Sequence, residues 1–171
     1  FNRLRLSTTY RIPIIAKEFF IDTKFSHLSD NRTNVNSTFD LDVNTQEYSI
    51  FNSQLSSDFR NINKRSTPAM ALIYRKDKWS LSFETGYVFR TIENTDQLRP
   101  ELSLKRKFRA VELGSNFNFN FSDKASMYGG YNLSNRPPQI NQLQPFEDVS
   151  DPLNTITGNP NLEPSNEHSL Y

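Results

Sequence analysis

Polar and apolar residues alternate with a period of two along much of this chain, and this alternation restricts the possible folds more than any other feature. Between Leu113 and Phe121, three Phe occupy odd positions and three Asn occupy the even positions between them. Segments 3–11, 17–27 and 79–89 repeat the scheme. Successive side chains of a strand point to opposite faces of a sheet, so each segment has one apolar and one hydrated face. The pattern predicts an all-β protein.

The composition averages hide this pattern. Only 35% of the 171 residues are hydrophobic, the mean hydropathy is -0.68, and the formal net charge is +1. That charge argues against nucleic acid as a partner, and the lack of Cys excludes disulfides and thiolate metal sites. No apolar run approaches the ~20 residues that a membrane helix needs. On averages alone the chain resembles a polar soluble protein, yet its aromatic content of 13% is high for such a chain.

Short and long connections alternate between the predicted strands. Short connections are expected near 11–17, 75–78 and 122–125, and long polar ones near 28–65, 91–106 and 135–163. Transmembrane β-barrels have short periplasmic turns and long extracellular loops, and their strands need about 9–11 residues to cross the bilayer. The order of the connections therefore fits an up-and-down meander whose two ends lie on opposite sides of a membrane.

A soluble β-sandwich also has alternating strands and stays open as an alternative. Two features favour the barrel. Charged residues such as Arg5, Asp22 and Glu84 lie on the hydrated face, which suits a water-filled lumen, and aromatic residues dominate the apolar face. The residues expected to face lipid are Trp79, Leu81, Phe83, Tyr87, Phe89, Phe117, Phe119 and Phe121. The favoured fold class is an antiparallel up-and-down transmembrane β-barrel segment.

The last third of the chain is rich in Pro and Asn. Arg136-Pro137 is followed by Gln142-Leu143-Gln144-Pro145-Phe146, and residues 158–164 read Gly-Asn-Pro-Asn-Leu-Glu-Pro. Pro pushes the residue before it to extended conformations, and Asn and Gly next to Pro favour turns. Physical reasoning alone therefore predicts an irregular surface loop with stiff kinks.

As a pattern, this segment resembles the barrel of TonB-dependent receptors, within the outer-membrane β-barrel family. The matching positions are Arg136, Pro137, Gln142, Leu143, Pro145, Phe146, Gly158, Asn159, Pro160, Asn161, Leu162 and Pro164. Glu163 and Ser165 depart from the Lys and Glu that are common there. The short turn and strand that begin at Lys78 also look like a unit of that family.

The resemblance implies a barrel of about twenty-two strands around a plug domain. About seven strands are expected in this chain, near 3–11, 17–27, 66–75, 78–90, 106–121, 125–134 and from Glu163 onward. Bacterial single-chain barrels have an even number of strands. Residues 1–171 are therefore expected to form part of one larger barrel domain, and no plug-like segment or coupling box is visible in them.

The function implied by the resemblance is nutrient uptake across the outer membrane of a Gram-negative bacterium. The implied partners are outer-membrane lipid, an unidentified nutrient ligand, and the TonB complex acting through a plug outside this segment. The loops near 28–65 and 135–163 are the expected ligand contacts. Two alternatives stay open: an outer-membrane barrel with a structural or adhesive role, and a soluble β-sandwich module that binds carbohydrate.

Few residues suggest chemistry of their own. His27 and His168 have no evident partners for nucleophilic catalysis, so no catalytic residue and no enzyme activity are predicted. No cofactor is predicted, and metal-ligand spacings are absent. Asp148 and Asp151 lie in an acidic segment that also holds Glu147, Glu163 and Glu167. Their oxygens suit a hard cation, but a solvated loop is the simpler interpretation.

Two further groups of charges carry expectations. Glu84 and Glu112 are lone acids on the hydrated face, and pairing with Arg or Lys of the neighbouring strand is expected. The basic cluster consists of Lys105, Arg106, Lys107 and Arg109. A solvated strand end is the simpler interpretation of this cluster, and contact with lipopolysaccharide phosphates is the alternative.

Overall fold

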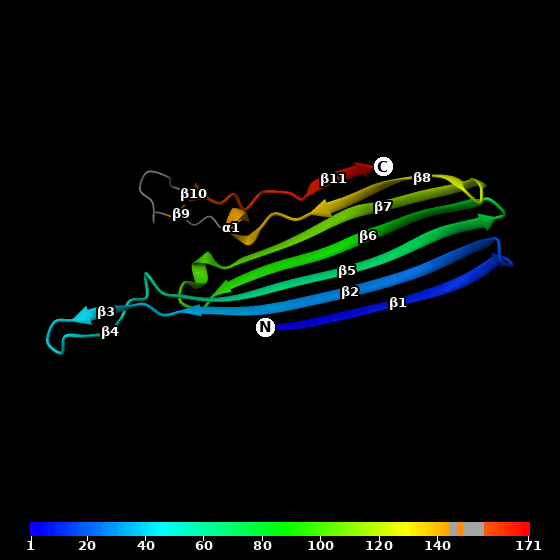
Figure 1. The fold of residues 1–171 in the computed structure, drawn as a ribbon. Coiled ribbons are helices and arrows are strands. Elements are labelled where there is room, and N and C mark those ends of the chain that lie inside the picture. The colour runs from blue at the N-terminus through cyan, green and yellow to red at the C-terminus, as the bar shows by residue number, and fades with distance from the viewer. Residues whose placement is uncertain (144–146, 149–155) are drawn as a thin grey trace.

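Seven strands form one antiparallel sheet in sequence order (Figure 1). The computed structural model describes residues 1–143, 147–148 and 156–171. The strands of the sheet are β1 (Asn2–Ile15), β2 (Phe19–Asn36), β5 (Ser57–Lys76), β6 (Trp79–Asp96), β7 (Leu104–Ser122), β8 (Ala125–Arg136) and β11 (Ser165–Leu170). The predicted all-β class, the up-and-down order and the number of seven strands are confirmed.

Short turns and long connections lie at opposite ends of the sheet (Figure 1). Residues 16–18, 77–78 and 123–124 make the turns at one end, here called the short-turn end. Lys17 and Asp77 adopt left-handed φ values of 66° and 46°, as tight turns require. The other end, the long-loop end, holds the hairpin of β3 (Phe39–Asp42) and β4 (Glu47–Phe51), the 3-10 helix η1 (Pro100–Leu102), the short helix α1 (Ile140–Leu143), and the small ladder of β9 (Glu147–Asp148) and β10 (Ile156–Thr157).

The strands run further into the long-loop end than the sequence predicts. The connections are shorter than the predicted 28–65 and 91–106, because β2, β5, β6 and β7 take up residues 28–36, 57–65, 91–96 and 104–106 and leave 37–56 and 97–103 as connections. Residues 28–36 pair in unbroken register with 57–65. Backbone hydrogen bonds hold such a ladder whatever its side chains are, so loss of the aromatic alternation did not end the strands.

The alternation sorts side chains onto two faces, named here the aromatic face and the polar face. The register places Trp79 opposite Phe119 and Leu81 opposite Phe117 on the aromatic face. All eight residues that were expected to face lipid lie on this face. Ring pairs strengthen it, with centroids 4.3 Å apart for Trp79 and Phe119, and 4.9 Å apart for Tyr87 and Phe89.

Strand β1 lies at one edge of the sheet and contains Pro13, which the sequence analysis placed in a turn. The pairing of β1 with β2 shifts between Pro13 and Ile15, and the turn follows at residues 16–18. Pro lacks the N–H that a ladder needs, so edge strands and bulges are where a sheet accepts it. The turn is therefore shorter than predicted.

Gly129 and Gly130 sit where β8 is approached closely from both faces. A Cβ on Gly129 would lie 2.5 Å from the Phe117 ring, and a Cβ on Gly130 would lie 2.6 Å from the Tyr171 ring. The two rings therefore cover β8 on opposite faces, and a side chain at either glycine would displace one of them.

No helix among the described residues is long and apolar enough to cross a membrane.

The single meander sheet does not favour the β-sandwich alternative. A sandwich buries the inner faces of two packed sheets, whereas the two additional ladders described here have only two strands each. The buried apolar cluster of the described residues consists of Ile92, Phe108 and Leu143 and lies at the long-loop end.

Candidate functional site on the polar face

Charged side chains pair across the polar face in the part of the sheet next to the short turns. The Arg11 guanidinium donates two hydrogen bonds to the Asp22 carboxylate on the adjacent strand, at 2.7 and 2.8 Å. Lys24 on β2 lies 2.5 Å from the carboxylate of Glu84 on β6, although β5 runs between these two strands. Paired charges of this kind fit a hydrated wall better than a packed core.

A second pair also passes over an intervening strand. Arg65 on β5 lies 2.5 Å from Glu112 on β7, with β6 between them. The expectation that Glu84 and Glu112 pair with basic residues was right, but their partners lie two strands away rather than on the neighbouring strand. Each intervening strand has a small residue opposite the acid, which leaves room for the basic side chain to cross. Ala71 lies opposite Glu84, and Gly86 lies opposite Glu112.

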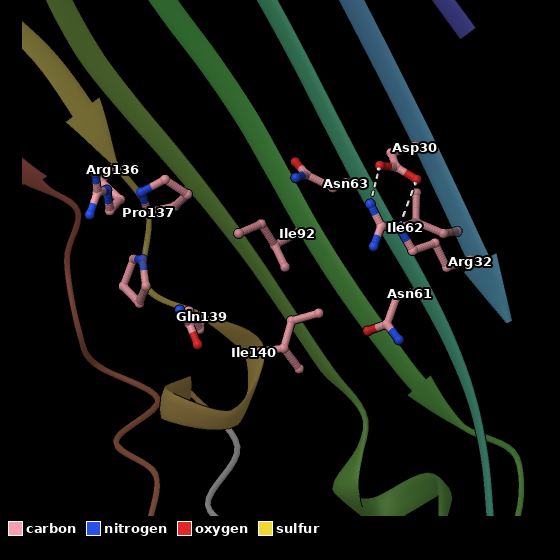
Figure 2. A pocket seen from close by; sticks show the side chains of 11 residues that line it. Asp30, Arg32, Asn61, Ile62, Asn63, Ile92, Arg136, Pro137, Gln139 and Ile140 are labelled. Carbon is pink, nitrogen blue, oxygen red and sulfur yellow. Dashed lines mark hydrogen bonds and ion pairs between the residues drawn. The ribbon is translucent and has the colours of Figure 1, made fainter. Parts of the chain in front are cut away.

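A pocket of about 480 Å³ lies on the polar face at the long-loop end (Figure 2). Strands β2, β5 and β6 form its floor, and the segment that follows β8 forms its wall. The lining residues are Asp30, Arg32, Asn61, Ile62, Asn63, Ile92, Arg136, Pro137, Pro138, Gln139 and Ile140. The pocket combines charged, amide and aliphatic groups, which is the usual composition of a site for a small polar molecule.

Asp30 is the charged centre on one side of the pocket. Its carboxylate accepts hydrogen bonds from Arg32 at 3.0 and 3.2 Å and from Arg3 at 2.8 Å. These two guanidinium groups, Arg32 first, lower the pKa of Asp30 to about 2. One carboxylate between two cations leaves a surplus positive charge, which would attract the anionic or electron-rich part of a ligand.

The floor of the pocket holds amide groups whose hydrogen-bonding capacity is not used up. The side-chain oxygens of Asn61 and Asn63 are buried and have no partner among the described residues, and the same holds for the nearby Asn94. Asn94 is 2% exposed. Buried polar atoms normally have a protein or water partner, so these three oxygens are exceptional beneath the pocket floor.

The first half of the Pro-rich motif folds over the polar face and makes the pocket wall. After Arg136, the chain turns inward through Pro137 and forms α1, whose Leu143 is fully buried against Ile92 and Phe108. Ile140 packs beside the same cluster. The motif therefore anchors the segment through Leu143 and Ile140, which pack on a small apolar area of the polar face.

The second half of the motif returns to the first half. The Asn159 N–H donates to the backbone oxygen of Gln142 at 2.7 Å, and the Asn161 N–H donates to the Asn159 side chain at 2.9 Å. Arg106 reaches the Glu163 carboxylate at 3.1 Å. Gly158 and Pro160 flank Asn159 in this turn, and Leu162 and Pro164 follow it. Pro164 lies on the polar face, near Val88, Arg90 and Phe108. Together these contacts close the loop over the sheet.

Several predicted residues of the motif and of the acidic segment fall outside the described residues. Pro145, Phe146 and Asp151 are among them, and so are the side chains of Glu147 and Asp148. Glu163 pairs with Arg106, and Glu167 pairs with Arg136 at 2.9 Å. Two of the five acids are thus paired with arginines, and the prediction of a cation at Asp148 and Asp151 lies outside the described residues. In the described part of the chain, no group of three potential metal ligands occurs.

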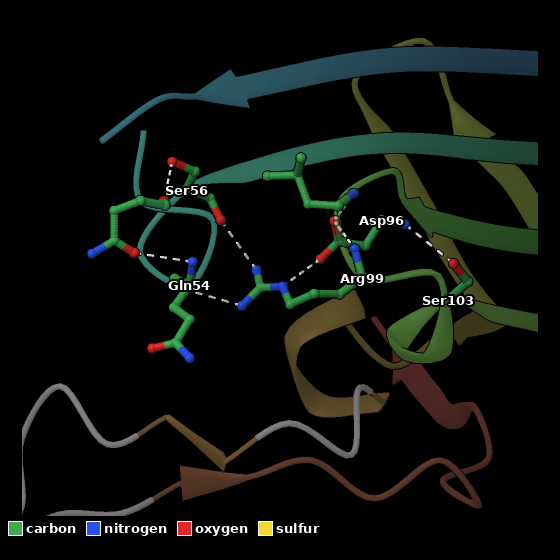
Figure 3. A network of polar contacts seen from close by, with 7 residues as sticks. Gln54, Ser56, Asp96, Arg99 and Ser103 are labelled. Atoms are coloured by element: carbon green, nitrogen blue, oxygen red, sulfur yellow. Dashed lines mark hydrogen bonds and ion pairs between the residues drawn. The ribbon is translucent and has the colours of Figure 1, made fainter. Parts of the chain in front are cut away.

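A cluster of polar contacts connects two loops at the long-loop end (Figure 3). Arg99 donates to the fully buried carboxylate of Asp96 at 3.1 Å and to the backbone oxygens of Gln54 and Ser56 at 3.4 and 3.3 Å. The Asp96 N–H donates to the Ser103 hydroxyl at 3.2 Å. This group, the Arg99 clasp, joins the connection that follows β4 to the connection between β6 and β7.

The two histidines hydrogen-bond to neighbouring hydroxyl groups. His27 Nδ1 lies 2.8 Å from the Ser66 hydroxyl, and His168 Nδ1 lies 2.8 Å from the Tyr131 hydroxyl. Within the described residues, no carboxylate hydrogen-bonds to either imidazole, so neither set has the three groups of a hydrolytic triad.

Sequence reasoning missed the pocket residues Asp30, Arg32, Asn61 and Asn63. They lie in segments that were interpreted as loops, where no facing partner is defined. The signal that identifies them is parity: Asp30 and Arg32 continue the even, polar positions of β2, and Asn61 and Asn63 continue the odd, polar positions of β5.

Comparison with known proteins gives one match. Residues 114–171 match the model of the outer membrane protein beta-barrel family. The match spans the C-terminal part of β7, then β8, the Pro-rich motif and β11. No curated protein and no solved structure matches the chain. The matched family and the up-and-down sheet together support an outer-membrane β-barrel protein and indicate an outer-membrane location.

Proposed function

We propose that this chain is part of the barrel wall of a TonB-dependent receptor that takes up a nutrient across the outer membrane of a Gram-negative bacterium. The observation that carries the proposal is the Pro-rich motif, which resembles that of such receptors and folds over the polar face to build a pocket at the long-loop end. In this orientation the short turns face the periplasm and the pocket faces the lumen near the cell exterior.

The composition of the pocket favours a polar ligand. Arg32 and Arg136 offer cationic groups, Asn61 and Asn63 offer amides, and Ile140 offers apolar contact. A metal chelate, cobalamin or an oligosaccharide presents groups that suit such a surface. We expect the ligand to touch the pocket and the loops beside it before it moves inward.

The test uses the full-length protein that contains this segment. Purified in detergent, it should bind the periplasmic domain of TonB, and uptake of a labelled ligand by cells should require TonB. Ferric hydroxamate, cyanocobalamin and a maltooligosaccharide serve as probes. If the full-length protein has no plug domain and does not bind TonB, the proposal is wrong, whatever the three probes show.

A second candidate function is an adhesive or structural barrel. The β3–β4 hairpin extends from the long-loop end (Figure 1) and exposes the apolar residues Val43, Tyr48 and Ile50, and Leu55 is exposed in the connection that follows it. Exposed apolar groups on a projecting hairpin suit contact with another surface. Loss of cell adhesion on replacing these side chains by Ser, together with absence of TonB binding, would favour this alternative.

A further inference from the structure

The aromatic face changes character towards the long-loop end. On β6 the large apolar side chains end at Phe89, and the register places Arg109 of β7 opposite Phe89. One step further, Thr91 lies between Lys107 on β7 and Lys64 on β5. The cations therefore begin at the level where the aromatic side chains stop.

Five basic side chains form this area, which we name the basic patch. Its members are Arg60, Lys64, Lys105, Lys107 and Arg109, and all five are exposed. They come from two strands, β5 and β7, on either side of β6, and they lie on the aromatic face. Arg106, which the sequence places within the same cluster, faces the opposite side and pairs with Glu163. The pairing of the strands therefore brings these residues together, and the run of basic residues in the sequence accounts for only part of the patch.

Most of these cations lack an anionic partner. Lys105 pairs with Glu93 at 2.6 Å. In the part of the chain that the structure describes, the other four make no hydrogen bond or ion pair through their side chains. The pKa of Glu93 is lowered, first by its hydrogen bond with Lys105 and then also by Lys64 and Arg60. Asp58 lies two residues from Arg60 on the same face, so two carboxylates among five cations leave a net charge of about +3 on a surface beside the apolar wall.

This arrangement matches the position of lipid phosphates. Aromatic side chains at the edge of a transmembrane wall mark the boundary of the hydrocarbon layer. Cations just beyond that boundary, on the lipid side, meet the headgroup layer, where Lys and Arg bind phosphate. The long-loop end is the extracellular end of such a barrel, so the headgroups at this level belong to the outer leaflet.

We propose that the basic patch is a binding site for the phosphate groups of lipopolysaccharide in the outer leaflet, with Lys64 and Lys107 as its centre. The inference rests on the barrel and its orientation and does not require coupling to TonB. The site holds the lipid from outside the wall, so it is distinct from the pocket on the polar face.

The test measures binding of bisphosphorylated lipid A to the full-length protein in detergent micelles by native mass spectrometry. The variant carries Lys64→Gln, Lys107→Gln and Arg109→Gln. The matched control carries Lys17→Gln, Lys78→Gln and Lys124→Gln, which remove the same charge at the short-turn end. Because each basic residue near a lipid surface contributes about fivefold to binding, the first variant should bind roughly a hundredfold more weakly. The control should bind as the wild type does.

Additional measurements identify the source of the phosphate and guard against misfolding. Dephosphorylated lipid A should bind much more weakly than lipid A, and inorganic phosphate should not displace bound lipid A. Heat-dependent gel mobility shows whether each variant forms its barrel, and a variant with Lys64→Arg and Lys107→Arg should keep the binding. Unchanged binding by the Gln variant, equal binding of dephosphorylated lipid A, or displacement by inorganic phosphate would each overturn the proposal.

Discussion

The two ends of the sheet use the same strands in different ways. Next to the short turns, no loop covers the aromatic face among the described residues. The polar face there carries ion pairs between adjacent strands and between strands separated by one other strand. At the long-loop end, the aromatic face becomes basic, and α1 with its motif covers the polar face. The comparison teaches that one unbroken backbone ladder serves two environments, because the side chains change while the strand pairing continues.

The largest effect is expected where the motif is anchored at the long-loop end. Leu143→Ala removes a fully buried side chain from the contact with Ile92 and Phe108. Such truncations cost about 2–5 kcal/mol, and here the loss should fall on the loop alone. Hydrogen exchange should rise sharply in residues 139–143 and stay unchanged in β6 beside the short turn. Leu162→Ala, at a residue that is 36% exposed, is the matched control. Equal exchange in both variants would contradict the anchoring role.

The Arg99 clasp should hold two connections in place at the long-loop end. Arg99→Met leaves the buried Asp96 carboxylate without its guanidinium partner, which should cost about 2 kcal/mol locally. Limited proteolysis should then cut within 52–56 and 97–103 at similar rates, since the clasp holds both segments. Lys105→Met, which removes an exposed cation from a neighbouring ion pair, should leave these sites protected. Faster cleavage of only one loop would show that the two are not joined.

The ion pairs that pass over an intervening strand test the part of the polar face that α1 does not cover. A double-mutant cycle with Arg65→Met and Glu112→Gln should give a coupling free energy of about 1 kcal/mol, measured by denaturant unfolding in detergent. The more exposed pair of Lys24 and Glu84 should give less, because water screens it. A larger coupling for the exposed pair would contradict the proposed role of burial.

Acid should affect the long-loop end through Asp30. The pKa of this carboxyl is lowered to about 2 by Arg32 and Arg3, so its contribution to stability is present above the unfolded pKa near 4 and is lost as pH falls towards 2. Thermal unfolding between pH 5 and pH 2 should show this loss, and the Asp30→Asn variant should lack it. A parallel decline in both proteins would assign the acid sensitivity to other groups.

Much of the fold could be predicted from the sequence, and the reason lies in particular strands. Residues 79–89 and 113–121 alternate regularly because each segment has apolar side chains on one face of the sheet and polar side chains on the other. Residues 28–36 and 57–65 are mostly polar and have no regular apolar face, so no contrast identified them as strands, and the pocket residues Asp30 and Asn63 were missed with them. The motif was recognised as a pattern, but the burial of Leu143 depends on a contact with Phe108 that sequence distance hides.

The pairs that pass over a strand have a consequence for assembly. A slip of one residue between strands exchanges the two faces, and the alternation forbids it. A slip of two residues preserves both faces, so aromatic and polar patterns cannot detect it. The β2–β5 and β5–β6 ladders align Lys24 with Gly86, so in the native register Lys24 reaches Glu84 across an offset of two residues. A two-residue shift that increases this offset would move the charges about 7 Å further apart, so the contact opposes slippage in that direction in both ladders.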